Sequence, residues 1–240
     1  LSFQPVLYSY WRSSCSWRAR IALNLKEIPY DIKPVSLIKG GGEQHCNEYR
    51  EVNPMEQVPS LCIDGHTLVE SLNIMHYLEE TRPQRPLMPA DCFKRAKVRE
   101  ICEVISSGIQ PLQNLIVLIY VGEEKKKEWA QHWIMRGFRA VEKLLSASAG
   151  KYCVGDEITL ADCCLVPQVF NMKLTPRFTI HPKVHKTLQY AHVSRLYYCI
   201  SAHGLLSQYE SHRFGHIFDK YVVTWGVTRF LHVGVLLCVF

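Results

Sequence analysis

The sequence predicts an α/β amino-terminal domain followed by an all-α carboxyl-terminal domain. Up to about residue 80, short apolar runs typical of strands alternate with segments of helical spacing. Three prolines between residues 82 and 89 then stop the last of these helices and form a semi-rigid linker. Beyond the linker, apolar residues recur at intervals of three and four, which is typical of amphipathic helices. We therefore expect domains over residues 4–83 and 90–171, followed by a divergent tail of uncertain order over residues 172–240.

The amino-terminal domain is expected to follow the order β-α-β-α-β-β-α. An apolar run at residues 6–10 predicts the first strand, and residues 13–28 then take up helical spacing. Residues 30–37 alternate like a second strand and lead through three glycines into a polar helical stretch. Two further runs form a β-hairpin that turns at residues 64–65, and a helix over residues 71–80 closes the domain.

The carboxyl-terminal domain is expected to consist of helices alone. Apolar residues between Val98 and Leu112 predict a long amphipathic helix that bends at Pro111. Residues 123–145 predict a second helix. Residues 159–162 then have the form of a capping box, a hydroxyl residue followed three positions later by an acid, and lead into a third helix.

Composition narrows the class of protein further. The ten cysteines are scattered without a CxxC pair, so we expect reduced thiols and no metal site. No run of ~18 uncharged apolar residues and no basic-then-apolar start occurs, so neither a membrane span nor a signal peptide is predicted. Residues 1–171 carry 20 Lys+Arg and 20 Asp+Glu, so the net charge of +6 arises entirely in the tail. We expect a cytoplasmic protein that binds no nucleic acid through its main body.

The strongest candidate for chemistry is the string Ser13-Ser14-Cys15-Ser16-Trp17-Arg18, placed where a strand turns into a helix. The simplest interpretation is a helix N-cap. The functional one is a cradle for a thiolate, because the free N–H groups and the dipole of a helix start stabilise an anion. Lowering a thiol pKa of ~8.5 by two units requires roughly 2.7 kcal/mol. The pattern leaves open whether the sulfur belongs to Cys15 or to a bound cofactor.

Two other places favour a bound cofactor. A cis Val58-Pro59 bond would leave the Val58 backbone free to pair with an extended peptide, although most such bonds are trans. Glu70-Ser71 begins a helix, where the serine can take a carboxylate and the glutamate an ammonium, although an ordinary cap would also explain them. The three places together suit a ligand with a thiol, a peptide bond and an α-amino acid end. Glutathione has all three.

These features together resemble the cytosolic glutathione transferases, and the string at residues 13–18 resembles the zeta class in particular. The resemblance runs without a gap from Pro5 to Asn171 and implies a thioredoxin-like amino-terminal domain joined to an all-α domain. Other matching stretches are residues 53–55, 57–59, 108–115, 152–157 and 161–169.

The resemblance implies a catalytic site at Ser13, Ser14 and Cys15. Ser13 would donate its hydroxyl to the glutathione thiolate, and Cys15 would modulate the reaction without being the essential nucleophile. Ile116 departs from the small polar residue that the class usually has there. The implied glutathione-binding set is Ser13, Ser14, Cys15, Ser16, Trp17, Arg18, Gln44, Val58, Glu70, Ser71, Gln110, Asn114, Leu115 and Ile116.

The reaction that the resemblance implies is the cis-trans isomerisation of maleylacetoacetate to fumarylacetoacetate in tyrosine and phenylalanine breakdown. A thiolate adds to the conjugated double bond, the resulting single bond rotates, and elimination restores the alkene. Members of the class also act on α-haloacids, and Arg18 or another basic group could hold a substrate carboxylate. The family forms homodimers, so we expect one here, with small molecules as the other partners.

Past Asn171 the resemblance fails, and the segment that carries a substrate-side arginine in the class has no counterpart. We therefore expect the chain to bind glutathione but to turn over weakly. The tail itself can be poorly ordered sequence or a basic anchor for a membrane surface or nucleic acid. Two other functions stay open: a catalytically silent glutathione-binding module, and a thiol-disulfide oxidoreductase that uses Cys15.

Overall fold

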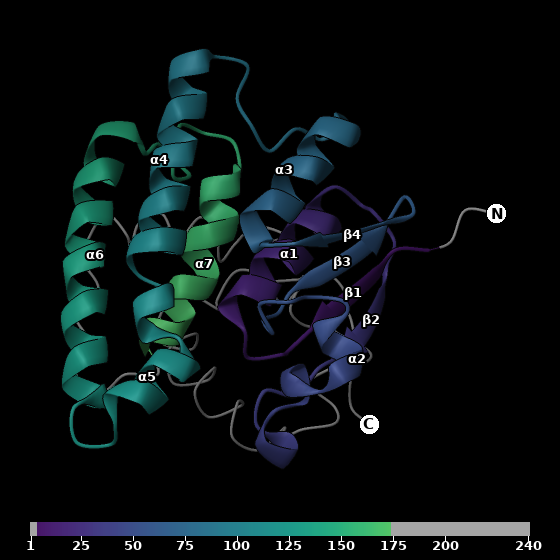
Figure 1. The fold of residues 1–240 in the computed structure, drawn as a ribbon. Coiled ribbons are helices and arrows are strands. Elements are labelled where there is room, and N and C mark those ends of the chain that lie inside the picture. Colours follow the sequence, from purple (N-terminus) through teal and green to yellow (C-terminus); the bar gives the residue numbers. More distant parts are fainter. Residues whose placement is uncertain (1–3, 174–240) are drawn as a thin grey trace, which may run out of the picture. The chain divides into compact units, whose positions relative to one another are not determined.

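The computed structural model describes residues 4–173 of the chain. Its amino-terminal part is built on a mixed four-stranded sheet with the strand order β2-β1-β3-β4 (Figure 1). Strand β1 pairs in parallel with β2 and antiparallel with β3, which pairs antiparallel with β4. The elements are β1 (Val6–Ser9), α1 (Ser14–Leu25), β2 (Asp31–Pro34), α2 (Asn47–Arg50), β3 (Ser60–Ile63), β4 (His66–Val69) and α3 (Ser71–Thr81), with short 3-10 turns at Lys39–Gly41 and Glu43–His45. The expected order β-α-β-α-β-β-α is confirmed.

The hairpin between β3 and β4 turns where the sequence predicts. Asp64 has φ 54° and Gly65 has φ 77°, so both central residues adopt the left-handed conformation that tight hairpin turns require. Ile63 faces His66 across the turn, which fixes the register of the pair. This register sets the position at which β4 ends and α3 begins, beside the candidate site.

The helical part consists of α4 (Cys92–Gly108), α5 (Leu115–Val121), α6 (Lys126–Ser148) and α7 (Leu160–Lys173). The expectation of one long helix bent at Pro111 is wrong, because α4 ends at Gly108 and Pro111 starts a separate 3-10 turn over Pro111–Gln113. Proline lacks the N–H that a continuing helix needs, whereas the first position of a new turn tolerates it. The second helix, α6, begins and ends slightly later than expected.

The capping box expected at the start of α7 is confirmed. The Asp162 carboxylate accepts hydrogen bonds from the N–H of Thr159 at 2.8 Å and from its hydroxyl at 3.0 Å. Its other oxygen accepts the Cys153 N–H at 2.9 Å, which ties the preceding loop to the helix. Asp162 therefore holds the first turn of α7 and the approach to it together.

One hydrophobic core runs through both the sheet part and the helical part. It includes Leu7 and Ile21 from the first part and Ile101 and Leu165 from the second, and each of these side chains is at most 1% exposed. Helix α7 packs against α1 and also against α4. The ring of Trp17 in α1 meets that of Phe170 in α7 edge-on, with centroids 5.2 Å apart. The two expected domains thus share their interior.

The proline-rich linker is held in place by one buried ion pair. Lys26 and Glu79 lie 2.7 Å apart, with side chains 1% and 12% exposed. The Lys26 ammonium also donates to three linker carbonyl oxygens, those of Arg82, Gln84 and Arg85. The Glu79 carboxylate accepts the backbone N–H of Leu87 and Met88 at 3.1 and 3.2 Å. The linker is therefore fixed at both of its ends.

Within residues 4–173, no single helix has both the length and the apolar character needed to cross a bilayer. The segments Cys92–Gln113 and Leu115–Val121, which lie at 44° to each other, meet both criteria only when they are taken together. The eight cysteines in this part are free thiols. The expectation for the tail lies outside the described residues, apart from the last two positions of α7.

Candidate functional site

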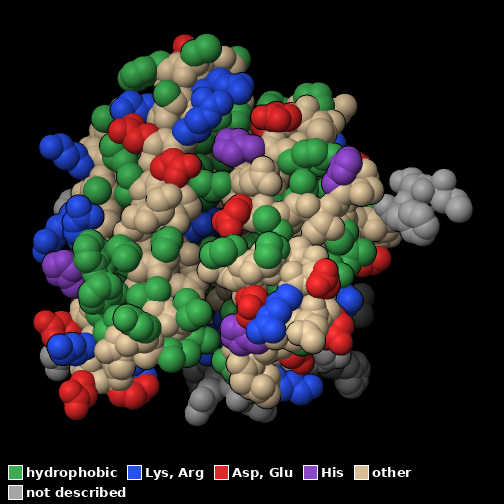
Figure 2. Space-filling view, viewed as in Figure 1, with side chains coloured by type: hydrophobic (Ala, Val, Ile, Leu, Met, Phe, Trp, Pro, Cys, Tyr) green, Lys and Arg blue, Asp and Glu red, His purple; other side chains and the backbone are tan. Residues whose placement is uncertain are grey.

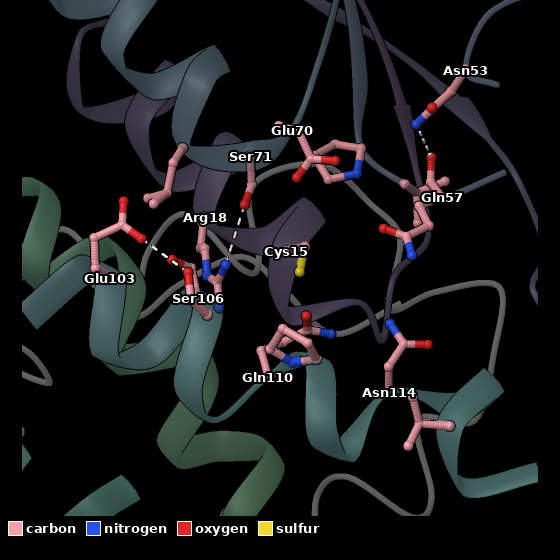
Figure 3. Close-up of a pocket in the computed structure, with 16 residues that line it drawn as sticks. Cys15, Arg18, Asn53, Gln57, Glu70, Ser71, Glu103, Ser106, Gln110 and Asn114 are labelled. Carbon is pink, nitrogen blue, oxygen red and sulfur yellow. Dashed lines mark hydrogen bonds between the residues drawn. The ribbon is translucent and has the colours of Figure 1, made fainter. Parts of the chain in front are cut away.

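A pocket of about 300 Å³ lies between the sheet part and the helical part (Figure 3). One wall comes from the start of α1, the loop before β3 and the start of α3. The other comes from the end of α4 and the segment that leads into α5. The lining residues are Cys15, Arg18, Asn53, Gln57, Val58, Pro59, Glu70, Ser71 and Leu72 on the first wall, and Glu103, Ser106, Ser107, Gln110, Pro111, Asn114 and Val117 on the second.

The start of α1 is organised by serine hydroxyls. Ser13 is the N-cap of the helix, and its Oγ accepts a hydrogen bond from the Ser16 N–H at 3.1 Å. Ser16 Oγ in turn accepts the N–H of Tyr10 at 3.4 Å, which ties the helix start to the residue after β1. Because Ser13 uses its oxygen as an acceptor, its hydroxyl hydrogen is left to donate. Ser13 can therefore cap the helix and donate to an anion at the same time.

The thiol of Cys15 lines the pocket two residues after this cap. Burial raises the pKa of Cys15, and the positive charge of Arg18 does not offset that effect. Negative charge on Cys164 and Glu70 raises it further, while the Ser14 hydroxyl lowers it slightly. The thiol is therefore protonated at neutral pH. The helix start suits the sulfur of a bound ligand better than the sulfur of Cys15.

The loop before β3 presents unpaired backbone to the pocket. Asn53 donates its side-chain amide to the carbonyl of Gln57 at 2.8 Å, and Tyr49 donates its hydroxyl to the same oxygen at 2.6 Å. The Val58-Pro59 bond is cis, as the peptide-pairing hypothesis required. Among residues 4–173, no hydrogen bond engages the Val58 backbone. Val58 can therefore pair with the backbone of a peptide ligand.

The start of α3 is not an ordinary cap, which corrects the simpler of the two interpretations. Glu70 has φ 67° and ψ 118°, a conformation that costs a residue with a side chain about 1–3 kcal/mol. Its carboxylate makes no capping hydrogen bond to the helix that begins at Ser71. The N–H groups of the first turn thus receive no acceptor from the cap residue. Free N–H groups at a helix start can take an anion, and the Glu70 carboxylate lies beside these.

The helical wall presents polar side chains from α4 and from the residues just after it. Glu103 and Ser106 or Ser107 lie on α4 three or four positions apart, and Gln110 follows before the turn at Pro111; all of them line the pocket. The Ser107 hydroxyl donates to the Glu103 carboxylate at 2.9 Å. Asn114 caps α5 by accepting the Ile116 N–H at 3.2 Å.

The structure brings half of the candidate residues together in this pocket. Those that line it are Cys15, Arg18, Val58, Glu70, Ser71, Gln110 and Asn114. Those that do not line it are Ser13, Ser14, Ser16, Trp17, Gln44, Leu115 and Ile116.

The residues outside the wall have other positions. Ser14 and Ser16 are buried behind the helix start, and Trp17 belongs to the core. Gln44 is 8% exposed, with its Oε1 unpaired among the described residues. Leu115 and Ile116 are exposed at the start of α5.

Several lining residues did not emerge from the sequence. Asn53 and Gln57 both precede the Val58-Pro59 pair by at most five residues, and this proximity was the available signal. Glu103 and Ser106 could have been found from their three- and four-residue spacing to Gln110 on a predicted helix. Within residues 4–173, no group of three or more His, Cys, Asp or Glu side chains is placed to hold a metal ion.

Two sequence families match the chain: the glutathione S-transferase N-terminal domain over residues 12–81 and the glutathione S-transferase C-terminal domain over residues 112–213. The second match continues past Asn171, where the resemblance described above ends. The fold and the pocket between its two parts thus define the class as that of the glutathione S-transferases.

The relatives narrow this class. The probable maleylacetoacetate isomerase 2 of Drosophila melanogaster is 85% identical over 170 residues, which cover 71% of this chain and 75% of the relative. A zeta-class glutathione S-transferase of Euphorbia esula is 45% identical and covers 75% of this chain and 83% of its own length. The solved maleylacetoacetate isomerase of Methylobacterium extorquens AM1, with bound malonate and glutathione, is 31% identical, has a TM-score of 0.76, and covers 81% of this chain and 95% of its own. The chain belongs to the zeta-class glutathione S-transferase family of the maleylacetoacetate isomerases.

Proposed function

We propose that the chain is a glutathione-dependent cis-trans isomerase that converts maleylacetoacetate to fumarylacetoacetate, and that it also acts as a glutathione transferase on α-haloacids. The observation that carries the proposal is the joint pocket, in which a helix start, a free peptide backbone and a second helix start surround one space. The names of the relatives support the enzyme over a silent glutathione-binding module.

The pocket fits glutathione by the chemistry of its walls. The Val58 backbone would pair with the peptide of the ligand, and Ser71 at the start of α3 would hold its α-carboxylate. The Glu70 carboxylate, whose strained backbone keeps it out of a capping role, would meet the ammonium group. Gln44 has an unpaired buried Oε1 and would need to reach the ligand from outside the wall.

The residues of this chain would hold the reacting sulfur in its charged form. Bound glutathione supplies a thiolate that adds reversibly to the conjugated double bond of the substrate. Ser13 would donate its hydroxyl hydrogen to that sulfur, and the dipole of α1 would favour the same charge. Cys15, whose raised pKa keeps it protonated, would shape the pocket without attacking the substrate.

The test is a progress curve of maleylacetone isomerisation by the full chain with glutathione. We expect Ser13→Ala to lower kcat/KM at least tenfold, because a hydrogen bond to a charged group contributes about 1.5–3 kcal/mol. Cys15→Ala should change the kinetics but retain turnover, and Ser146→Ala in α6, outside the pocket, should leave the rate as it is. Equal rates with and without Ser13→Ala would contradict the proposed role of this serine. Loss of turnover in Cys15→Ala would favour the oxidoreductase.

We further propose that the protein is a cytoplasmic homodimer. The family resemblance supports this assembly, and light scattering of the purified chain would test it. The domain limits at residues 4–83 and 90–171 also stay proposals, since the two parts share a core.

A further inference from the structure

Arg18 has a buried guanidinium of which one edge is unused. The side chain is 1% exposed, although it lines the pocket. Its Nη1 donates to the Ser71 hydroxyl oxygen at 3.2 Å. Its Nε and Nη2 have no hydrogen-bond partner among the residues that the structure describes. Buried polar atoms are almost always paired, so this edge indicates a missing partner.

The neighbouring arginine on the same helix shows the usual arrangement. Arg20 is also buried, at 8% exposed, but its guanidinium donates to the Ser9 hydroxyl at 2.7 Å and to the carbonyl oxygens of Tyr10 and Trp11 at 3.3 and 3.2 Å. The guanidinium of Arg20 therefore finds its hydrogen-bond acceptors within the protein, and these bonds explain why the side chain is buried. Arg18 has no such explanation.

A second unpaired group lines the same pocket from the other wall. The hydroxyl oxygen of Ser106, on α4, is buried without a partner in the described part of the chain. Figure 3 shows the Arg18 guanidinium reaching from α1 toward Ser106 at the same side of the pocket. Two elements far apart in sequence thus converge on one unfilled polar space.

The chemistry of that space selects an anion with two oxygens. Nε and Nη2 lie on the same edge of the planar guanidinium and present two parallel N–H groups, which match a carboxylate. The serine hydroxyl can supply a third donor. None of the ion pairs within residues 4–173 involves Arg18, even though Glu70 and Glu103 line the same pocket. A water molecule could fill the space but would not neutralise the charge.

We propose that Arg18 and Ser106 form a carboxylate subsite on the buried wall of the pocket. The subsite deepens the proposed function and rests on it, because the carboxylate would belong either to glutathione or to the second substrate. Its two donors come from the sheet part and the helical part, so the ligand would bridge them. The two sources share one chemistry and can be separated by experiment.

The test is isothermal titration calorimetry of the full chain with glutathione, with malonate, and with malonate at saturating glutathione. We expect Arg18→Lys to weaken at least one of these affinities tenfold or more, because lysine keeps the charge but loses the paired N–H groups. Ser106→Ala should weaken the same affinity several-fold. Ser146→Ala is the matched control, since this serine lies on α6 outside the pocket and its hydroxyl donates to the carbonyl oxygen of Glu142, and it should change that affinity less than twofold.

The pattern of losses identifies the source. A loss for glutathione alone assigns the subsite to the cofactor, and a loss for malonate alone assigns it to the substrate. Unchanged affinities in both Arg18→Lys and Ser106→Ala would overturn the subsite. A wild-type chain that binds no glutathione would instead overturn the proposed function, while its malonate titrations would still decide the subsite.

Thermal unfolding separates this role from a structural one. We expect Arg18→Met to unfold at nearly the same temperature as the wild type without ligand, because the one hydrogen bond of Arg18 within residues 4–173, that to Ser71, contributes only about 0.5–1.5 kcal/mol. The same variant should lose the rise in Tm that the ligand identified by calorimetry causes in the wild type. A lower unliganded Tm together with an unchanged ligand-induced rise would show that Arg18 is only structural.

Discussion

The thiol of Cys15 is subject to two opposing electrostatic effects. It lies in the first turn of α1, where the helix dipole favours negative charge, and Arg18 adds to this. Burial acts in the opposite direction and is the larger effect, so the pKa of the thiol is raised. The same helix start can therefore stabilise an anion in the pocket while its own cysteine stays neutral.

Alkylation rates test this balance. At pH of about 7 we expect iodoacetamide to modify Cys15 at least tenfold more slowly than the exposed Cys46 and Cys92, because a raised pKa leaves less thiolate. The rate should rise as the pH is taken above the usual thiol pKa of about 8.5. Mass spectrometry of tryptic peptides resolves the three sites. Faster modification of Cys15 than of its exposed counterparts at neutral pH would indicate a nucleophile and contradict the assignment.

Residue types and their order predicted some of the site well. The sequence raised a cis Val58-Pro59 bond as a hypothesis, although most such bonds are trans, and it predicted a helix that begins at Ser71; the structure has both. Ser106 could not be assigned in this way, because its importance comes from a guanidinium that is 88 residues away in the sequence and from burial that only packing creates. Local turn and capping patterns can be predicted from the sequence, whereas a buried polar atom that lacks a hydrogen-bond partner cannot.

At the scale of single elements, the linker after α3 depends on Lys26. We expect Lys26→Met to lower the free energy of unfolding by about 3–5 kcal/mol, because it leaves the buried Glu79 carboxylate without its counterion. Three linker carbonyl oxygens lose a donor at the same time. Urea denaturation at neutral pH measures the change.

Lys97 provides the matched control for this substitution. It pairs with Glu100 at 2.7 Å on α4, but the two side chains are 31% and 40% exposed. Lys97→Met should therefore change the free energy of unfolding by no more than about 1 kcal/mol. Similar losses from both substitutions would mean that the linker is not held by the buried pair.

Helix α5 is an exposed apolar element: all of its seven residues are apolar or aromatic, and none of them is buried. Figure 2 shows hydrophobic side chains gathered over this helix, where Ile119 is 69% exposed and Tyr120 is 92% exposed. We expect Ile119→Ala to change the free energy of unfolding by less than about 0.5 kcal/mol. Ile109→Ala, at a residue that is 0% exposed, should cost about 2–5 kcal/mol in the same urea titration.

The comparison of these two isoleucines also tests the surroundings of α5. A loss above about 1 kcal/mol for Ile119→Ala would mean that other protein surface covers the helix in solution. The existence of α5 as a separate element was not predicted from sequence. Its apolar residues continue the spacing of α4, and only the proline chemistry at Pro111 and the cap at Asn114 divide them.

At the scale of the whole molecule, the sequence predicts the order of the elements but not how they share an interior. Periodicity and turn residues fixed each strand and most helices to within a few positions. The run that forms α7 is apolar on all sides, and periodicity cannot say which neighbours such a helix will have. In the structure it packs against α1 and α4, so one core crosses the predicted domain boundary.

The edge-on contact of Trp17 with Phe170 has a consequence for expression of the two parts as separate polypeptides. A polypeptide that stops at residue 83 would expose an indole to water, and the complementary piece would expose a phenyl ring. Because the two halves also share one core, we expect each half to aggregate when it is made alone. When the two halves are co-expressed, we expect them to associate through this contact. Their co-purification would then measure the interface between the two parts without any assay of catalysis.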